Sequence, residues 1–260
     1  MTDPATPQPG DTEAEFGIPI PGVILPPEQW AKTALKKLPP QGPLNLEEIF
    51  GRSAPLIVEL GCGNGRYTLM SALARPECNH LASDILPAVI RYATRRANQR
   101  GLHHVRFAVK DAQTLVREYL PPGSAAEIHI YHPQPFHDRR EAYKRLITPP
   151  FLADVHRALQ PGGLIFAQTD SPEYWGYMLQ VCSGFFHFQP QNGPWPDAPE
   201  GRSRREILSR SRGVTIYRGF GSRRDDLKPE NLARLAKTLP KPLFRTRGVW
   251  CELDELEQER

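Results

Sequence analysis

The stretch PLIVELGCGNG, residues 55–65, decides the fold. Its first half is a short apolar run between a proline and a glycine, which is typical of a strand buried on both faces. Its second half places Gly61, Gly63 and Gly65 directly before a helix-like stretch, residues 66–74. Glycines at such a junction allow a tight turn and let backbone amides approach a ligand closely. The stretch therefore predicts the first unit of an α/β fold, with a ligand site at its turn.

Strand-like and helix-like stretches alternate after this unit. The strand-like stretches are residues 78–84, 104–109, 127–132 and 163–169, and the helix-like stretches are 87–100, 113–119, 151–159 and 173–182. This alternation predicts a doubly wound, mostly parallel sheet with helices on both faces. No helix-like stretch separates the last two strand-like stretches, 185–189 and 214–219. They predict an antiparallel hairpin at one edge of the sheet, with the arginine-rich loop 200–212 inside it.

Proline marks the N-terminal boundary of the predicted domain. The chain has 260 residues and 28 prolines, about twice the usual share, and ten of them fall within residues 1–43. Low hydrophobicity without periodicity predicts a disordered arm there. The α/β domain is expected over residues 44–225, and a charged C-terminal extension over 226–260.

Composition excludes several classes of protein. The four cysteines are far apart and form no CxxC pair, so neither a disulfide framework nor a zinc site is expected. The first residues lack a basic start followed by an apolar run, and no stretch has the 18 apolar residues of a membrane helix. We therefore expect a cytoplasmic protein that neither contacts a membrane nor holds a metal. The net charge of +4 is too small to identify a partner.

Acidic residues follow the first three predicted strands. Glu59 stands two places before the first glycine, Asp84 ends the second strand, and Asp111 follows the third. The glycine spacing G-x-G-x-G is one residue shorter than the dinucleotide fingerprint, and a carboxylate at Glu59 would repel a pyrophosphate. Asp84 can accept both hydroxyls of a ribose, and Asp111 can hold the amino group of a base. The alternative is that the glycines only form a turn and the aspartates only cap helices.

Three further clusters lie beyond the first three strands. The HPQPF segment, residues 132–136, follows the fourth strand, where ligands sit in an open α/β sheet. Asp170 ends the fifth strand and either caps the next helix or faces the substrate. Residues 202–224 contain eight arginines interleaved with Tyr217 and Phe220, which indicates a phosphate-binding surface. The alternatives for the first and third clusters are a plain turn and a solvated loop.

Taken in order, these pieces resemble the bacterial tRNA (guanine-N7)-methyltransferase family of class I methyltransferases, which have a Rossmann-like fold. The resemblance covers roughly residues 44–222 and includes LEEIFGRSAPLIVELGCGNG (46–65), KRLITPPFLADVHRALQPGG (144–163) and QTDSPEYWGYML (168–179). It implies S-adenosylmethionine as cofactor and tRNA as partner. By position it implies that Glu59, Asp84 and Asp111 bind the cofactor, together with Gly61, Gly63 and Gly65. It also implies a substrate-binding set, Asp138, Arg140, Asp170, Thr215 and Arg218.

The chain departs from the family pattern at three positions. The family signature FPDPW is HPQPF here. Gln134 therefore stands where the family has an aspartate, and that aspartate is assigned the central catalytic role. The family's basic residue four places later is Asp138, and the glutamate that closes its T-x-[FY]-E segment is Arg218. Because these last two changes exchange opposite charges, we expect Asp138 and Arg218 to face each other with reversed polarity.

The resemblance implies methyl transfer from S-adenosylmethionine to N7 of a guanine in tRNA. Three other functions fit parts of the sequence. A homologue that binds RNA without turnover would follow from the loss of the aspartate at Gln134. A methyltransferase for another acceptor would bind the cofactor but not tRNA. A nicotinamide dehydrogenase fits least well, because of the glycine spacing and Glu59.

Overall fold

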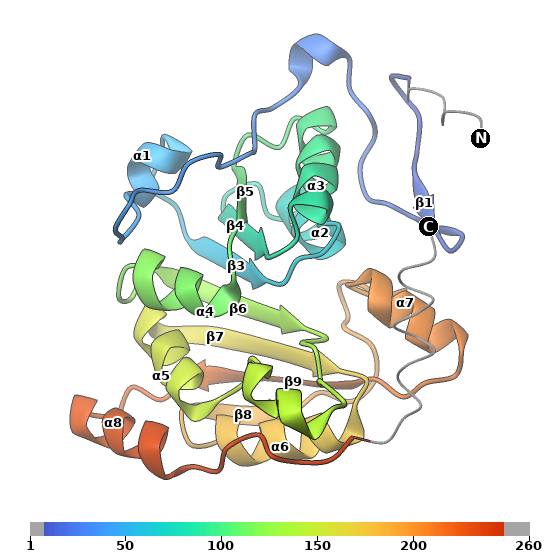
Figure 1. Ribbon diagram of the computed structural model, residues 1–260. Coiled ribbons are helices and arrows are strands. Elements are labelled where there is room, and N and C mark those ends of the chain that lie inside the picture. The colour runs from blue at the N-terminus through green and yellow to red at the C-terminus, as the bar shows by residue number, and fades with distance from the viewer. Residues whose placement is uncertain (1–7, 247–260) are drawn as a thin grey trace.

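The apolar run of the opening stretch is strand β3, Leu56–Leu60, and all five of its residues are buried. It is the third strand of a seven-stranded sheet, next to the central strand β6, in a computed structural model that describes residues 8–246 (Figure 1). The strand order is β5-β4-β3-β6-β7-β9-β8. The other strands are β4 (Asn79–Asp84), β5 (Val105–Val109), β6 (Ala125–Tyr131), β7 (Leu159–Thr169), β8 (Phe186–Pro190) and β9 (Tyr217–Arg223).

Strands β3 to β7 run parallel, and β9 pairs antiparallel with both β7 and β8. The predicted doubly wound sheet with an antiparallel edge hairpin is therefore confirmed. The order reverses at β3, whose neighbours are β4 on one side and β6 on the other. In open α/β sheets, ligands bind at the carboxyl ends of the strands at such a reversal.

Helices cover both faces of this sheet (Figure 1). They are α1 (Leu46–Phe50), α2 (Arg66–Ala74), α3 (Pro87–Gln99), α4 (Ala112–Thr114), α5 (Pro149–Ala158), α6 (Pro172–Cys182), α7 (Arg204–Ser211) and α8 (Pro229–Thr238). Three shorter turns of helix are η1 (Pro27–Gln29), η2 (Leu115–Tyr119) and η3 (Arg139–Lys144).

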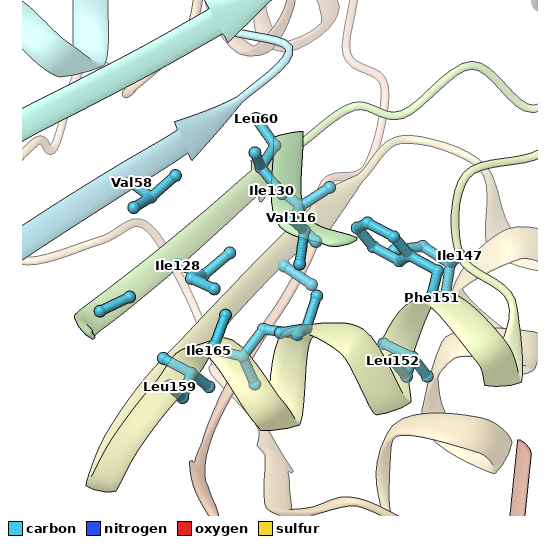
Figure 2. Close-up of a cluster of buried hydrophobic side chains, with 14 of the residues drawn as sticks. Val58, Leu60, Val116, Ile128, Ile130, Ile147, Phe151, Leu152, Leu159 and Ile165 are labelled. Carbon is cyan, nitrogen blue, oxygen red and sulfur yellow. The ribbon is translucent and has the colours of Figure 1, made fainter. Parts of the chain in front are cut away.

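The two faces have separate hydrophobic cores. On one face, Val58, Ile128 and Ile165 of three neighbouring strands pack against Phe151 and Leu152 of α5 (Figure 2). On the other face, the smaller cluster joins α2 and α3 through residues such as Leu69, Ala72, Ala93 and Ala97. The small side chains on this second face allow α2 and α3 to approach the sheet closely, and this fixes the loops that precede them.

The prediction of a disordered N-terminal arm is wrong for residues 8–43. This segment forms the two-stranded hairpin β1 (Ala14–Glu15) and β2 (Ile18–Pro19), and then runs along α3 (Figure 1). Ile20 and Ile24 are buried, and a short parallel bridge joins Ala34 to Phe107 of β5. The composition is unfavourable for an independent fold, but the domain supplies the apolar surface and the charges against which the segment packs.

The region between β8 and β9 also differs from the prediction. Residues 200–212 do not form a loop, because Arg204–Ser211 is the helix α7, and Ser203 accepts a hydrogen bond from the Glu206 amide as its cap. Strand β9 begins at Tyr217, three residues later than expected. Farther along, α8 packs Leu232 and Leu235 against the core. The extension predicted over residues 226–260 is therefore partly packed, and residues 247–260 lie outside the described residues.

Candidate active site

A cavity of about 330 Å³ opens at the carboxyl ends of the central strands, where the strand order reverses. That volume lies within the range of small-molecule sites, roughly 300–1,000 Å³. Its lining comes from the loops after β3, β4, β6 and β7 and from the start of α7. Of the predicted site residues, it contains Glu59, Gly61, Gly63, Asp84, Gln134 and Asp170.

The glycine loop between β3 and α2 forms one wall of the cavity. Gly61, Gly63 and Gly65 all have positive φ, at +74°, +51° and +79°, a region that residues with a Cβ rarely adopt. At Gly65 an added Cβ would lie 2.8 Å from the Cβ of Ala93, so α2 could not keep its contact with α3. The Gly63 amide donates to Asp84 Oδ2 at 3.0 Å, which joins the loop to the end of β4.

Glu59 lies at the base of the cavity and is 5% exposed. Its Oε2 atom accepts hydrogen bonds from the Thr68 amide and hydroxyl. Burial raises the pKa of Glu59 to about 8, and the two bonds from Thr68 only partly offset this effect. The carboxyl group is therefore mostly protonated at neutral pH, and a positive charge placed beside it would favour the ionised form.

Asp84 and Asp111 occupy different environments at neighbouring strand ends. Asp84 lines the cavity and also accepts a hydrogen bond from the Leu86 amide at 2.9 Å. Asp111 caps α4 by accepting from the Thr114 amide at 2.8 Å, and it does not line the cavity. In this structure Asp111 therefore acts as a helix cap, which was the alternative to a role in binding. A contact of Asp111 with the cofactor stays a prediction.

The HPQPF segment forms the opposite wall. His132 and Phe136 at its ends have positive φ, +49° and +43°, which turns the intervening residues toward the cavity mouth. Arg145 fixes this turn, because Nε donates to the Pro135 carbonyl at 2.6 Å and Nη2 to the Phe136 carbonyl at 2.9 Å. Gln134 is exposed at the rim, where its side chain can reach a ligand.

Asp170 lies behind this wall and is 4% exposed. Its Oδ2 accepts from Arg205 Nε at 2.7 Å and from the Ser209 hydroxyl at 3.1 Å, and His132 Nδ1 lies 3.4 Å from Oδ1. Burial alone would raise the pKa of Asp170, but His132 and Arg205 hold it well below its usual range. Asp170 is therefore an ionised group that joins the HPQPF segment to α7.

The expected pairing of Asp138 with Arg218 is wrong. Asp138 caps η3 and pairs with Arg140 at 2.6 Å on the surface. Arg218 is 6% exposed and donates instead to Glu206 of α7, which is fully buried. A buried guanidinium needs a buried counter-charge, and only an exposed carboxylate is present at Asp138.

Thr215 and Arg218 also lie away from the cavity. Thr215 is exposed in the loop before β9, and neither residue belongs to the cavity lining.

Two residues at the first turn of α7, Ser203 and Glu206, were not predicted from the sequence. They have the [ST]-x-x-E spacing of the family's T-x-[FY]-E segment. Ser203 lines the cavity, and Glu206 accepts from the Gln168 side chain at 3.0 Å and from the Arg202 amide at 2.8 Å. The capping-box pattern at residues 203–206 was the available signal.

Arg202 is a third residue at the site that was not predicted individually from the sequence. Its guanidinium lies over Trp195 and Tyr67, at 4.3 and 5.1 Å from the ring centroids, and it lines the cavity. It donates through Nη1 to the Tyr131 hydroxyl at 2.6 Å and through Nη2 and Nε to Asp197 Oδ1 at 2.7 and 3.1 Å. Among the described residues these bonds use three of the five N–H groups of a guanidinium.

The described part of the chain contains no group of three or more His, Cys, Asp or Glu that could hold a metal ion. It also contains no helix long and apolar enough to cross a membrane.

Comparison with known proteins identifies the family. A family profile described as "Putative methyltransferase" matches residues 53–217. A tRNA (guanine-N(7)-)-methyltransferase of Paracidovorax citrulli is 37% identical over 142 residues, which is 55% of this chain and 57% of that relative. The chain thus spans little more than half the length of this relative. The enzyme of the same name from Alcanivorax borkumensis is 30% identical over 190 residues, 73% of this chain and 79% of the relative.

Solved structures agree with the fold. The 16S rRNA methyltransferase KamB superposes with a TM-score of 0.55 at 12% identity, over 74% of this chain and 98% of that one. Because the identity is low, this likeness supports the class I methyltransferase fold alone. Together with the profile match and the cavity at the strand reversal, the sequence relatives show that the chain belongs to the tRNA (guanine-N7)-methyltransferase family.

Proposed function

We propose that this protein transfers the methyl group of S-adenosylmethionine to N7 of a guanine in tRNA. The observation that carries the proposal is one cavity that joins the glycine loop and its acids to the HPQPF segment at the strand reversal. Relatives named as tRNA (guanine-N(7)-)-methyltransferases support the acceptor. We place the reaction in the cytoplasm, where unmodified tRNA is available.

The residues on the first wall fit the cofactor of this family. S-adenosylmethionine supplies a methyl group on a sulfonium, together with a ribose and an α-amino acid end. Asp84, at a strand end beside the glycine loop, can accept the two ribose hydroxyls. The guanidinium of Arg202 matches the methionine carboxylate, because a guanidinium and a carboxylate form two parallel hydrogen bonds. Glu59 supplies negative charge on the same side of the cavity.

The second wall would hold the acceptor. Guanine N7 carries a lone pair and no proton, so its methylation needs no general base. Positioning the nucleophile in line with the methyl group can contribute roughly 7–11 kcal/mol. Gln134 at the rim offers an amide oxygen to the N–H groups of the purine, and Ser203 offers a hydroxyl across the cavity. The ionised Asp170 stabilises the arrangement of both through His132 and α7.

Basic side chains near this wall would contact the tRNA backbone. Arg140 is 89% exposed beyond the HPQPF segment, and Lys144 lies one helical turn farther along η3. Tyr143 of η3 is 76% exposed and offers an aromatic face for stacking. Arg204 at the start of α7 lines the cavity itself. We therefore place the tRNA across η3 and α7, with the target guanine entering between them.

Cofactor affinity is expected to depend on pH through Glu59. Because burial raises its pKa to about 8, the free protein holds a proton there at neutral pH, and a cationic ligand favours its release. Affinity for S-adenosylmethionine should rise between pH 6 and 8, by at most about tenfold per pH unit, and level off above 8. Titration calorimetry at several pH values measures this rise, and the Glu59→Gln variant should show a flat profile. A flat profile in the wild type would contradict the proposal for Glu59.

The raised pKa of Glu59 also determines how the stability of the folded protein depends on pH. The folded state binds the Glu59 proton more tightly than the unfolded chain does. The contribution of Glu59 to stability is therefore complete below its ordinary pKa of 4.5 and is lost as the pH rises through about 8. Cofactor binding should offset this loss, because the charged carboxylate then gains a partner.

A second function is favoured by one observation. Gln134 stands at the cavity rim in the position of the family aspartate, so a homologue that binds tRNA without turnover is the alternative. Incubation with labelled S-adenosylmethionine and either unmodified tRNA, ribosomal RNA or no RNA separates the two. Transfer to tRNA alone supports the proposal. Binding of both ligands without any transfer supports the alternative, and transfer to ribosomal RNA contradicts the acceptor.

A further inference from the structure

The N-terminal hairpin, residues 13–20, forms ion pairs with arginines at the C-terminal end of α3. Glu13 accepts from Arg100 Nη2 at 3.0 Å, and its Oε2 lies 3.4 Å from Arg96 Nε. Glu15 accepts from Arg96 Nη1 at 3.1 Å. Both arginine side chains are no more than 2% exposed. Buried guanidinium groups need counter-charges, and these two glutamates supply them.

Glu15 differs from Glu13 because it reaches the cavity wall. The Asn64 side-chain amide donates to Glu15 Oε1, and Arg66 Nη1 lies 3.8 Å from Glu15 Oε2. Asn64 and Arg66 both line the cavity, at the end of the glycine loop and the first residue of α2. Arg66 also donates to the Pro19 carbonyl of the same hairpin at 3.0 Å. Glu13 instead pairs with Arg95 and Arg96 of α3 and with Arg100 directly after that helix, and its backbone carbonyl accepts from the Ile20 amide.

The tip of the hairpin extends toward α7. Phe16 and Gly17 have positive φ, +50° and +78°, as in a tight two-residue hairpin turn. Phe16 is 49% exposed, and the guanidinium of Arg204 lies 5.0 Å from its ring centroid. Arg204, the first residue of α7, also lines the cavity. The hairpin therefore touches cavity-lining residues at the start of both α2 and α7, and Figure 1 shows β1 above α7.

From these contacts we propose that residues 13–20 support the cofactor site from behind its lining residues, with Glu15 as a positioning residue. Glu15 sets the direction of the Asn64 amide and the Arg66 guanidinium, and these two residues hold the end of the glycine loop. The hairpin thus orders the glycine-loop side of the cofactor site, and its tip reaches the start of α7 through Phe16 and Arg204. This inference rests on the proposed function, because it assigns the cavity to S-adenosylmethionine.

The test compares two variants of the full-length chain. Glu15→Gln keeps the shape and one acceptor oxygen but loses the charge. Its dissociation constant for S-adenosylhomocysteine should rise about tenfold, with tRNA affinity unchanged. Glu13→Gln is the matched control, because it removes a charge from the same hairpin without touching Asn64 or Arg66. It should lower the melting temperature as much as Glu15→Gln does and change the cofactor dissociation constant less than threefold.

A double-mutant cycle identifies the route of the effect. If Glu15 acts through Asn64, then Glu15→Gln combined with Asn64→Ala should bind S-adenosylhomocysteine no more weakly than Asn64→Ala alone. Equal weakening by Glu13→Gln and Glu15→Gln would overturn the role of Glu15, as would an unchanged affinity in Glu15→Gln. A wild type that binds no S-adenosylhomocysteine would instead refute the proposed function, and this inference with it.

Discussion

Replacing Glu206 by Gln should lower the free energy of unfolding by about 3–5 kcal/mol, the usual cost of removing one member of a buried ion pair. Glu206 is fully buried and accepts hydrogen bonds from Arg218, the Gln168 side chain and the Arg202 amide. Burial alone would raise the pKa of Glu206, but the charge and hydrogen bond of Arg218, together with the bonds from the Arg202 amide and Gln168, lower it below its usual value, so the carboxylate is ionised. A neutral amide would leave the charge of Arg218 buried without compensation.

Chemical denaturation measures this loss, and Asp138→Asn is the control. Asp138 is paired with the exposed Arg140, so its charge is already well solvated and the denaturation midpoint should not move. Equal losses in the two variants would contradict the assignment of Arg218 to Glu206. A marked loss in Asp138→Asn alone would restore the pairing that the sequence suggested.

Replacing Gln134 by Asp should raise the rate of methyl transfer 10–100-fold. The methylated guanine is cationic, and a carboxylate at the rim would stabilise the developing charge and grip the N–H groups of the purine. A charge-assisted hydrogen bond is about twice as strong as a neutral one, and about 1.4 kcal/mol corresponds to a factor of ten in rate. Gln134 is exposed, so the substitution should not disturb the fold.

Single-turnover kinetics at saturating cofactor and tRNA isolates this effect from binding. Gln134→Asn is the matched control, because it keeps a neutral amide and should give no gain. A rate for Gln134→Asp equal to or below that of the wild type, with both ligands bound normally, would show that this chain places the acceptor differently from its relatives.

Local sequence features were sufficient to predict which residues meet at the glycine-loop side of the cavity, and their contact with the cofactor stays a prediction. Glu59, Asp84 and the three glycines lie at the ends of short apolar strands, and the direction of parallel strands brings such ends to one edge. Asp170 lines the cavity beside the HPQPF segment for the same reason, and its contact with the substrate stays a prediction. In these cases neighbours along the chain determine the position of the residue.

Contacts between distant residues explain what the sequence analysis missed. Helix α7 is rich in arginine and has little apolar periodicity, so it resembled a solvated loop, although Arg205 and Glu206 are buried. The partner of Arg218 lies on that unrecognised helix. The N-terminal segment lacks a core of its own, and its glutamates pair with arginines on α3 and directly after it, more than 80 residues away. Composition describes a segment in isolation and cannot report such partners.

We propose that this cavity methylates guanine N7 in tRNA with a glutamine in the place of the family aspartate. The most direct measurement is transfer of a labelled methyl group from S-adenosylmethionine to unmodified tRNA, followed by identification of the product nucleoside by mass. We expect 7-methylguanosine as the product, which would show that Gln134 suffices. Cofactor and tRNA that both bind without yielding a methylated nucleoside, or a methyl group on any other atom, would contradict the account.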